Sequence, residues 1–156
     1  MAYVFDNSPL STLFKNYYRR RFPSLWQRFD DLAANGDIVS TCEVHREIED
    51  GAVESLREWA AQNGDLFTVP NPEEGAFVAR IYAVQHFQQN IERQKMLKGG
   101  RNADPFVIAK AAVTERTVVT MEKRQPNAVK IPNICDHFGV PCMTLEDFME
   151  TEGWEF

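Results

Sequence analysis

AYVFDNSP, residues 2–9, is a short apolar run that ends in a carboxylate and passes straight into a helix signal. The run from Tyr3 to Phe5 is typical of a buried strand, and Asp6 stands at its carboxyl end. In an α/β chain, this end of a strand is where the ligand crevice usually opens. We therefore expect Asp6 to belong to a functional site that further acids of the chain join.

The rest of the chain alternates strand signals with helix signals. The expected strands after the first cover residues 38–40, 66–69, 117–120 and 140–143, the last at a sheet edge because of Pro141. The expected helices cover about residues 8–21, 24–34, 42–49, 53–61 and 73–94, and three more begin at 104, 130 and 144, of which the second ends at 138. Their caps or first residues are expected to be Ser8, Ser24, Thr41 or Ser40, Asp104 and Thr144. This order predicts one α/β domain over residues 1–156, with a mostly parallel sheet of four to five strands and helices on both faces.

Composition narrows the class of protein. The 156 residues are 44% hydrophobic, which suits a single globular core, and no apolar run approaches the roughly 20 residues that cross a bilayer. Because Asp6 interrupts the first apolar stretch, no secretory signal is expected and a cytoplasmic location is predicted. The net charge of −6 argues against a general nucleic-acid coat, but it permits a local basic rim.

The cysteines predict no disulfide framework. They are odd in number, form no C-x-x-C pair and are expected to be reduced. A zinc site could be drawn from Cys42 and His45 with Cys135, His137 and Cys142, but these groups lack the compact spacing of zinc fingers.

Acids mark the ends of several expected elements. Asp6 ends the first strand, Asp104 opens a helix, and Glu122 lies two residues past the strand that ends at Thr120. Glu47 joins them if its helix packs beside the first strand, and Glu43 shares its helix face. A hard divalent cation would remove the repulsion among such carboxylates, and oxygen ligands suit Mg²⁺ or Mn²⁺.

Each acid also has an interpretation without chemistry. Asp104 before a proline is a good helix cap, Glu43 and Glu47 could solvate a helix face, and Glu122 could be an ordinary loop charge. Asp6 is the hardest to explain in this way, because a carboxylate at the end of so apolar a run needs a partner.

Four segments of the chain resemble the PIN domain, the metal-dependent ribonuclease fold of VapC-like toxins. They are YVFDNS at residues 3–8, VHREI at 44–48, ADPFVIAKA at 103–111 and VVTMEK at 118–123. The closing pieces, KIPNICDHFGV and EGWEF, resemble more narrowly a PIN-like bacterial family of unassigned function.

The resemblance implies hydrolysis of RNA phosphodiesters by metal-activated water, a cognate antitoxin and often a homodimer. Carried over by position, Asp6, Glu47 and Asp104 match the family's acids, with Glu43 as an alternative to Glu47. Glu122 takes the place of the fourth acid, which is commonly aspartate, as a direct ligand or as water-mediated support. Ser8 and Thr120 match the small polar positions beside the acids. Residues 93–101 then form a basic rim for RNA phosphates or a solvated loop, and its cations include Lys95, Lys98 and Arg101.

Two other functions fit parts of the pattern. A haloacid-dehalogenase-like phosphatase also begins with a strand-terminal aspartate, but its second aspartate would fall at Ser8. A PIN-like fold could also serve as a binding or regulatory module without catalysis.

Overall fold

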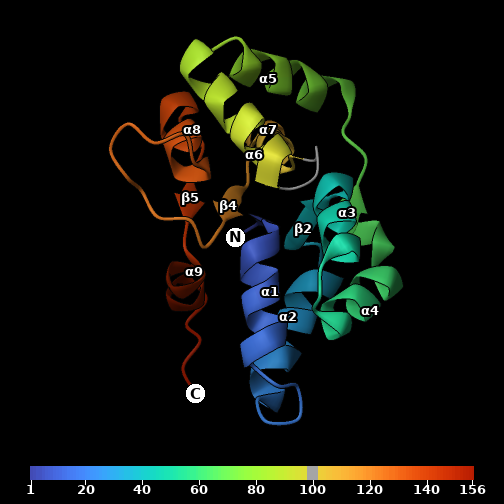
Figure 1. Cartoon of the computed structure of the whole chain (residues 1–156). Helices are drawn as coiled ribbons and strands as arrows, with labels where there is room; N and C mark the ends of the chain where they lie inside the picture. The colour runs from blue at the N-terminus through green and yellow to red at the C-terminus, as the bar shows by residue number, and fades with distance from the viewer. Residues whose placement is uncertain (98–101) are drawn as a thin grey trace.

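The computed structural model describes residues 1–97 and 102–156, with the side chains of 94–97 left out of the description. Helices surround a short-stranded central sheet (Figure 1). The strands are β1 Tyr3–Phe5, β2 Ile38–Thr41, β3 Phe67–Thr68, β4 Thr117–Val119 and β5 Cys142–Met143. The helices are α1 Asn7–Asn16, α2 Pro23–Ala34, α3 Cys42–Asp50, α4 Glu54–Gln62, α5 Pro72–Tyr82, α6 Gln88–Leu97, α7 Asp104–Thr114, α8 Ile131–Phe138 and α9 Leu145–Thr151, with 3₁₀ turns η1 Gly64–Leu66 and η2 Gln85–Phe87.

The sheet has the strand order β3-β2-β1-β4-β5, and each of its neighbouring pairs is parallel. Tyr3 of β1 pairs with Ile38 on one side and with Thr117 on the other. The predicted α/β class and the predicted edge position of the last strand are confirmed. Because the strands are parallel, their carboxyl ends lie along the same edge of the sheet.

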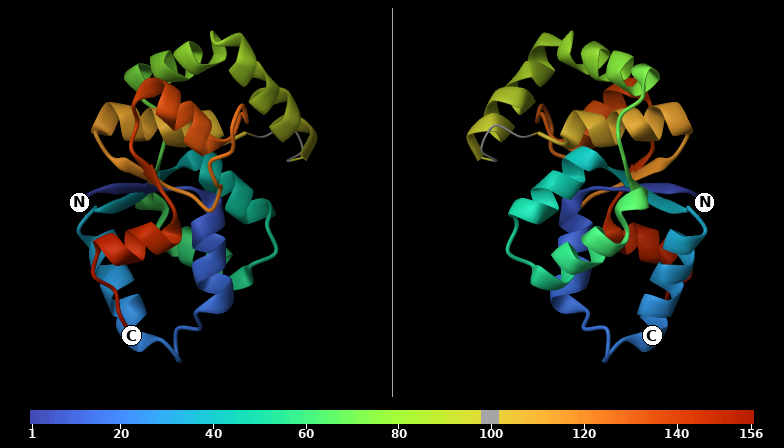
Figure 2. Two further views of the ribbon diagram at one scale, coloured as in Figure 1. Left: turned by 90° about the vertical axis from the view of Figure 1, so that its left-hand side faces the viewer. Right: turned by 90° about the vertical axis from the view of Figure 1, so that its right-hand side faces the viewer.

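Helices cover both faces of the sheet (Figure 2). One layer holds α5 to α8, in which α7 packs on β1, β2 and β4 and α5 packs on α7. The other layer holds α1, α2, α4 and α9, and its core is aromatic. Tyr3 and Phe5 meet Phe148 of α9 edge-on, with ring centroids 4.7 and 5.1 Å apart. β1 is therefore buried from both sides, as its apolar sequence predicts.

Two helix starts differ from prediction. Asp6, not Ser8, is the cap of α1, because its carboxylate accepts from the backbone N–H of Asn7 while Ser8 lies inside the first turn. Ser24 lies inside α2, which begins at Pro23 without a side-chain cap. Asp104 is the first residue of α7, and Ala103 before it occupies the N-cap position without a side-chain capping hydrogen bond. The predicted caps Thr41 and Thr144 are confirmed.

Two predicted helices are too long. α1 ends at Asn16, so Arg19, Arg20 and Arg21 lie in the turn that precedes α2. The helix predicted over residues 73–94 breaks after Tyr82, where Val84 is extended and η2 precedes α6. The ring of Phe87 in η2 packs edge-on against His137, with centroids 5.1 Å apart. Tertiary packing therefore decides a break for which the sequence carries no glycine or proline.

The carboxyl-terminal segment is tied to the first strand. The Tyr3 hydroxyl donates to the Glu152 carboxylate at 2.5 Å, and Trp154 packs edge-on against Phe148. Burial, and then the Glu152 carboxylate, raise the pKa of Tyr3 well above its ordinary value. Among helices in the described ranges, none combines the length and apolar character that a bilayer crossing requires.

Candidate functional site

Asp6 lies at the carboxyl edge of the sheet, between the ends of β1 and β4. Its N–H donates to the carbonyl of Val119, which continues the ladder one residue past β1. The residue is 5% exposed; its Oδ1 accepts from Asn7 N at 2.8 Å, and Oδ2 accepts from the hydroxyls of Ser8 and Thr120 at 3.1 and 3.0 Å. The carboxylate is thus held in one orientation by neutral donors. Its two oxygens offer about four acceptor sites, so Oδ1 retains one for a further ligand.

Ser8 and Thr120 also connect Asp6 to the segment after β4. The Ser8 hydroxyl accepts from the backbone N–H of Met121 at 3.2 Å, and the Thr120 hydroxyl accepts from that of Glu122 at 3.2 Å. The predicted supporting residues therefore do contact Asp6. They also fix the direction in which the chain leaves β4.

Glu122 is half-buried and points toward the start of α8. Its Oε2 atom accepts from the backbone N–H of Ile131 at 2.7 Å. A carboxylate at a helix amino terminus satisfies an N–H group that has no partner within the helix and is favoured by the helix dipole. Glu122 Oε2 therefore stabilises the start of α8. This contact agrees better with a supporting role for Glu122 than with a role as a direct metal ligand.

Asp104 is fully buried, in a second polar network. Its Oδ2 atom accepts from the Asn90 amide at 3.1 Å, and its N–H donates to the Asn102 side chain at 3.2 Å. The same Asn90 amide donates to the carbonyl of Val129 at 2.8 Å, while Asn90 Oδ1 accepts from Asn102 at 2.9 Å. α7 leads into β4 in a parallel sheet, so it runs antiparallel to the strands and its first residue lies toward their carboxyl edge.

The acids of α3 begin at the same edge, because Thr41 ends β2 and caps α3. Glu43 lies in the first turn, paired with Arg46 at 2.7 Å. Burial raises the pKa of Tyr82, and the carboxylates of Glu43 and Asp104 raise it further, so both act on the same hydroxyl. Glu47 is half-buried one turn later, with its Oε1 atom buried.

Hydrogen bonds place two of these acids in defined networks. One network joins Asp6 to Ser8 and Thr120, and the other joins Asp104 to Asn90 and Asn102. Within residues 1–97 and 102–156, no three His, Cys, Asp or Glu side chains are grouped closely enough to hold a metal ion. The zinc grouping considered from the sequence is likewise not formed there. The donors at this edge are carboxylate oxygens, which suit a cation that keeps several of its waters. The predicted rim residues Lys98 and Arg101, and the side chain of Lys95, lie outside the described residues.

Asn90 and Asn102 were not predicted to belong to the site. Their partners are brought together only by the fold, since Asn90 bonds Val129 across 39 positions. One weak signal exists in the sequence: asparagine is a poor helix former, and Asn90 occupies a buried position in α6. Without the fold, that signal indicates only that the side chain needs a partner.

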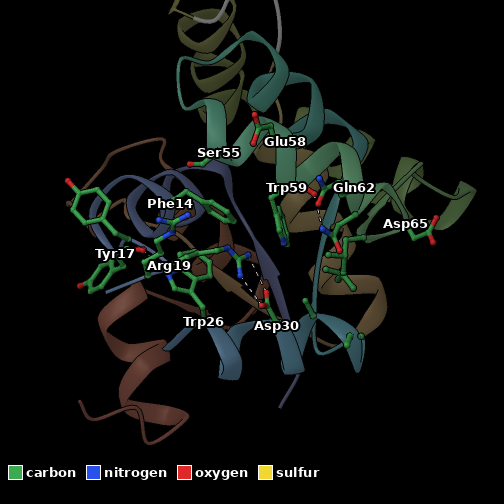
Figure 3. A pocket seen from close by; sticks show the side chains of 18 of the residues that line it. Phe14, Tyr17, Arg19, Trp26, Asp30, Ser55, Glu58, Trp59, Gln62 and Asp65 are labelled. Atoms are coloured by element: carbon green, nitrogen blue, oxygen red, sulfur yellow. Dashed lines mark hydrogen bonds and ion pairs between the residues drawn. The ribbon is translucent and has the colours of Figure 1, made fainter. Parts of the chain in front are cut away.

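A separate groove of about 1140 Å³ lies between the end of α1, α2 and α4 (Figure 3). Its floor is aromatic, formed by Phe14, Trp26 and Trp59. Arg19 lies over the Trp26 ring at 4.3 Å and pairs with Asp30 at 2.9 Å, while Arg20 and Arg21 are exposed at the rim. The groove thus joins an apolar floor to a cationic border.

Comparison with known proteins gives a family but no activity. Residues 3–156 match the family described as a domain of unknown function, DUF4411. No curated protein matches the chain. Among solved structures, the chain is similar to one described as VapBC2 from Rickettsia felis bound to a DNA fragment from their promoter. The sequence identity is 13% and the TM-score is 0.47, and the match covers 92% of this chain and 98% of that one. The family match confirms the narrower resemblance, which was to a family of unassigned function.

Proposed function

The chain belongs to the DUF4411 family, and we propose that it is a metal-dependent endoribonuclease that hydrolyses RNA phosphodiester bonds at the carboxyl edge of its sheet. The observation that carries this proposal is the state of Asp6. The residue is 5% exposed, and its carboxylate is oriented by hydroxyl and amide donors and keeps an acceptor site on Oδ1. Burying an ionised carboxylate among neutral groups is costly, and a bound cation would offset that cost.

Asp6 and Asp104 are the residues that would hold Mg²⁺ or Mn²⁺, together with Glu47 or its alternative Glu43 and with Glu122 in support. When bound, such a cation activates water and stabilises the negative charge of a phosphodiester under attack. Ser8 and Thr120 hold the Asp6 carboxylate, and Asn90 holds that of Asp104. Lys95, Lys98 and Arg101 are proposed, from the sequence alone, to bind RNA phosphates.

The test is manganese-dependent cleavage of a panel of RNAs by the purified protein. Asp6→Asn and Asp104→Asn should each abolish cleavage, whereas Asp65→Asn, the same substitution at an exposed position of η1, should leave it intact. Cleavage that persists in chelator, or in Asp6→Asn, would refute the proposed site. Loss in Glu47→Gln but not in Glu43→Gln would assign the third acid to Glu47, and the reverse would assign it to Glu43.

A toxin role needs a partner that restrains the nuclease, and we propose the aromatic groove as its docking surface. The partner segment would place apolar side chains against Tyr18, which is 65% exposed, above the largely buried rings of Phe14, Trp26 and Trp59. Its acidic side chains would lie against Arg20 and Arg21. Peptides selected on the wild-type protein from a random display library should therefore be apolar and acidic. They should bind the double variant Arg20→Glu, Arg21→Glu at least about tenfold more weakly, which corresponds to about 1.4 kcal/mol.

The matched control for the groove is Arg57→Glu, which changes an exposed arginine of α4 that does not line the groove. Selected peptides that bind the double variant as tightly as the wild type would remove the groove from the proposal. That outcome would leave the nuclease hypothesis unaffected, because the groove and the acids are tested separately.

A further inference from the structure

The segment between β4 and α8 leaves the sheet and returns to the helix as a loop, residues 122–131 (Figure 1). Its two ends are joined, because the Glu122 Oε2 atom accepts from the backbone N–H of Ile131 at 2.7 Å. Just before the loop, the Thr120 hydroxyl donates to the Asp6 carboxylate at 3.0 Å and accepts from the N–H of Glu122 at 3.2 Å. The neck of the loop, formed by Glu122 and Ile131, therefore lies next to the Asp6 network.

Two lysines stand at this neck, one on each arm of the loop. Lys123 directly follows Glu122, and Lys130 directly precedes Ile131. The hydrogen bond that closes the neck thus brings both lysines to the same end of the loop. Lys123 is exposed and Lys130 is half-buried, and neither forms an ion pair with residues 1–97 or 102–156. Their charges are therefore available to a ligand.

The other charges of the loop do not cancel those of the lysines. The Arg124 guanidinium binds both carboxylate oxygens of Asp136, at 3.1 Å each, so these two charges offset one another. Glu122 supplies one carboxylate at the neck against two lysines. The neck therefore keeps a net positive charge, although the whole chain has a net charge of −6. Such a local surplus beside a site for phosphodiesters suits an anionic ligand.

The stability of α8 does not account for Lys130. This residue occupies the N-cap position of the helix, where its side chain makes no capping hydrogen bond. Serine, threonine, aspartate and asparagine are the residues that stabilise this position, and the helix dipole disfavours a cation there. A lysine at a position where it costs local stability is better explained by what it binds.

The loop is also held along its length, so that little order has to be gained when a ligand binds. The Asn133 side chain of α8 donates to the carbonyl of Gln125 at 2.7 Å. On the other arm, Asn90 of α6 donates to the carbonyl of Val129 at 2.8 Å. A binding surface that is fixed in advance loses less conformational entropy on association.

We propose that Lys123 and Lys130 bind RNA phosphates next to the phosphodiester that is cleaved. The inference rests on the proposed function, from which it takes the substrate, but it concerns binding and not cleavage. Lysines that contact phosphates hold the nucleic acid in place without reading its sequence. This pair is separate from the rim predicted over residues 93–101, because it lies in the described part of the chain and is placed by the hydrogen bond of Glu122.

The test is the salt dependence of RNA binding by the full-length protein in chelator, where metal-dependent cleavage cannot occur. Fluorescence anisotropy of labelled oligouridylate gives the affinity over a range of salt concentrations. Each contact with a phosphate of a single strand contributes about 0.7 to the slope of log affinity against log salt. Lys123→Ala and Lys130→Ala should each reduce the slope by about this amount, and the double variant should reduce it by about 1.4.

Two controls isolate the charge of the loop lysines. Lys15→Ala makes the same substitution at an exposed lysine in the last turn of α1 and should leave the slope unchanged. The double variant Lys123→Arg, Lys130→Arg keeps both charges and should keep the wild-type slope. Lys130→Ala should not lower the melting temperature, because it removes a cation from the amino end of α8.

The outcomes distinguish this inference from the nuclease proposal. An unchanged slope in the double alanine variant, with a wild type that binds oligouridylate, would overturn the role of the lysines and leave the nuclease proposal standing. A reduced slope together with a wild type that cleaves no RNA in manganese would support the lysines as phosphate ligands and refute the nuclease proposal. A wild type that binds no oligouridylate even at low salt would overturn both.

Discussion

The Asn90 network makes the most demanding prediction about the structure. Asn90 is 3% exposed, and its NH₂ group donates to the Asp104 carboxylate and to the Val129 carbonyl. Its Oδ1 atom accepts from the Asn102 side chain, which is buried like that of Asp104. Asn90→Ala removes all of these bonds. A bond to a neutral group contributes about 1 kcal/mol and one to a carboxylate about 2 kcal/mol, so the free energy of unfolding should fall by about 4 kcal/mol.

Urea unfolding in chelator, followed by tryptophan fluorescence, measures this loss. With a denaturant dependence of about 2 kcal/mol per molar, the midpoint should move by about 2 M. Gln89→Ala, the exposed neighbour on the same helix, is the control and should change the free energy by at most about 0.5 kcal/mol. A loss below about 1 kcal/mol in Asn90→Ala would show that the network does not hold Asp104.

The variant Asn90→Asp tests the same contact through charge. It places a second carboxylate beside the Asp104 oxygen that Asn90 now contacts at 3.1 Å, and repulsion raises the pKa of the pair in the folded state. A raised folded pKa means that folding takes up a proton, so the deficit relative to wild type is largest at neutral pH. The part of the deficit that repulsion causes should shrink as pH falls through the raised pKa and disappear below the unfolded value of about 3.9. The part that comes from the lost amide donors should remain. A deficit independent of pH would contradict the contact.

Three further predictions concern single contacts. Lys110 is 7% exposed and donates to the Thr68 hydroxyl at 2.6 Å, and burial lowers its pKa. Between the lowered folded pKa and the unfolded value of about 10.4, the unfolded chain therefore binds more protons than the folded one. In urea melts, the stability of wild type relative to Lys110→Met should rise with pH over this range. Tyr3→Phe removes the bond to Glu152 and should cost about 2 kcal/mol in thermal or urea melts. Glu122→Gln weakens the cap of α8 and should cost about 1 kcal/mol. If Mn²⁺ binds the other acids as proposed, it should still raise the Tm of this variant, as it should that of wild type. Loss of that rise would instead make Glu122 a direct ligand.

Local patterns predicted most of the fold. The apolar run before Asp6, the β-branched strand that precedes Thr120 and the caps at Thr41 and Thr144 all behave as their sequences indicate. These signals are local, since each rests on residues within one turn or one strand. The mostly parallel sheet then follows from the alternation of elements and the handedness of crossovers. The strand order β3-β2-β1-β4-β5 was not predicted, because these signals do not say which strands are neighbours.

The polar contacts of the site could not be predicted in this way. The Thr120 hydroxyl reaches Asp6 across 114 positions, and Asn102 and Asn90 meet only because the chain returns from α6 to α7. A hydroxyl or amide carries no periodic signal that names its partner. The resemblance to PIN domains did indicate Thr120 and Ser8, but it gave no reason to consider Asn90.

The two networks also differ in what supports them, and this difference has a consequence for function. Asp6 is held by Asn7, Ser8 and Thr120, which continue two adjacent strands of the core sheet. Asp104 is held instead by Asn90 of α6, a helix outside the sheet whose own anchor is the carbonyl of Val129. A displacement of α6 must therefore change the surroundings of Asp104, whereas the hydrogen bonds to the Asp6 carboxylate come from residues that follow β1 and β4. The carboxyl edge thus combines one carboxylate fixed by the sheet with another whose position depends on helix packing.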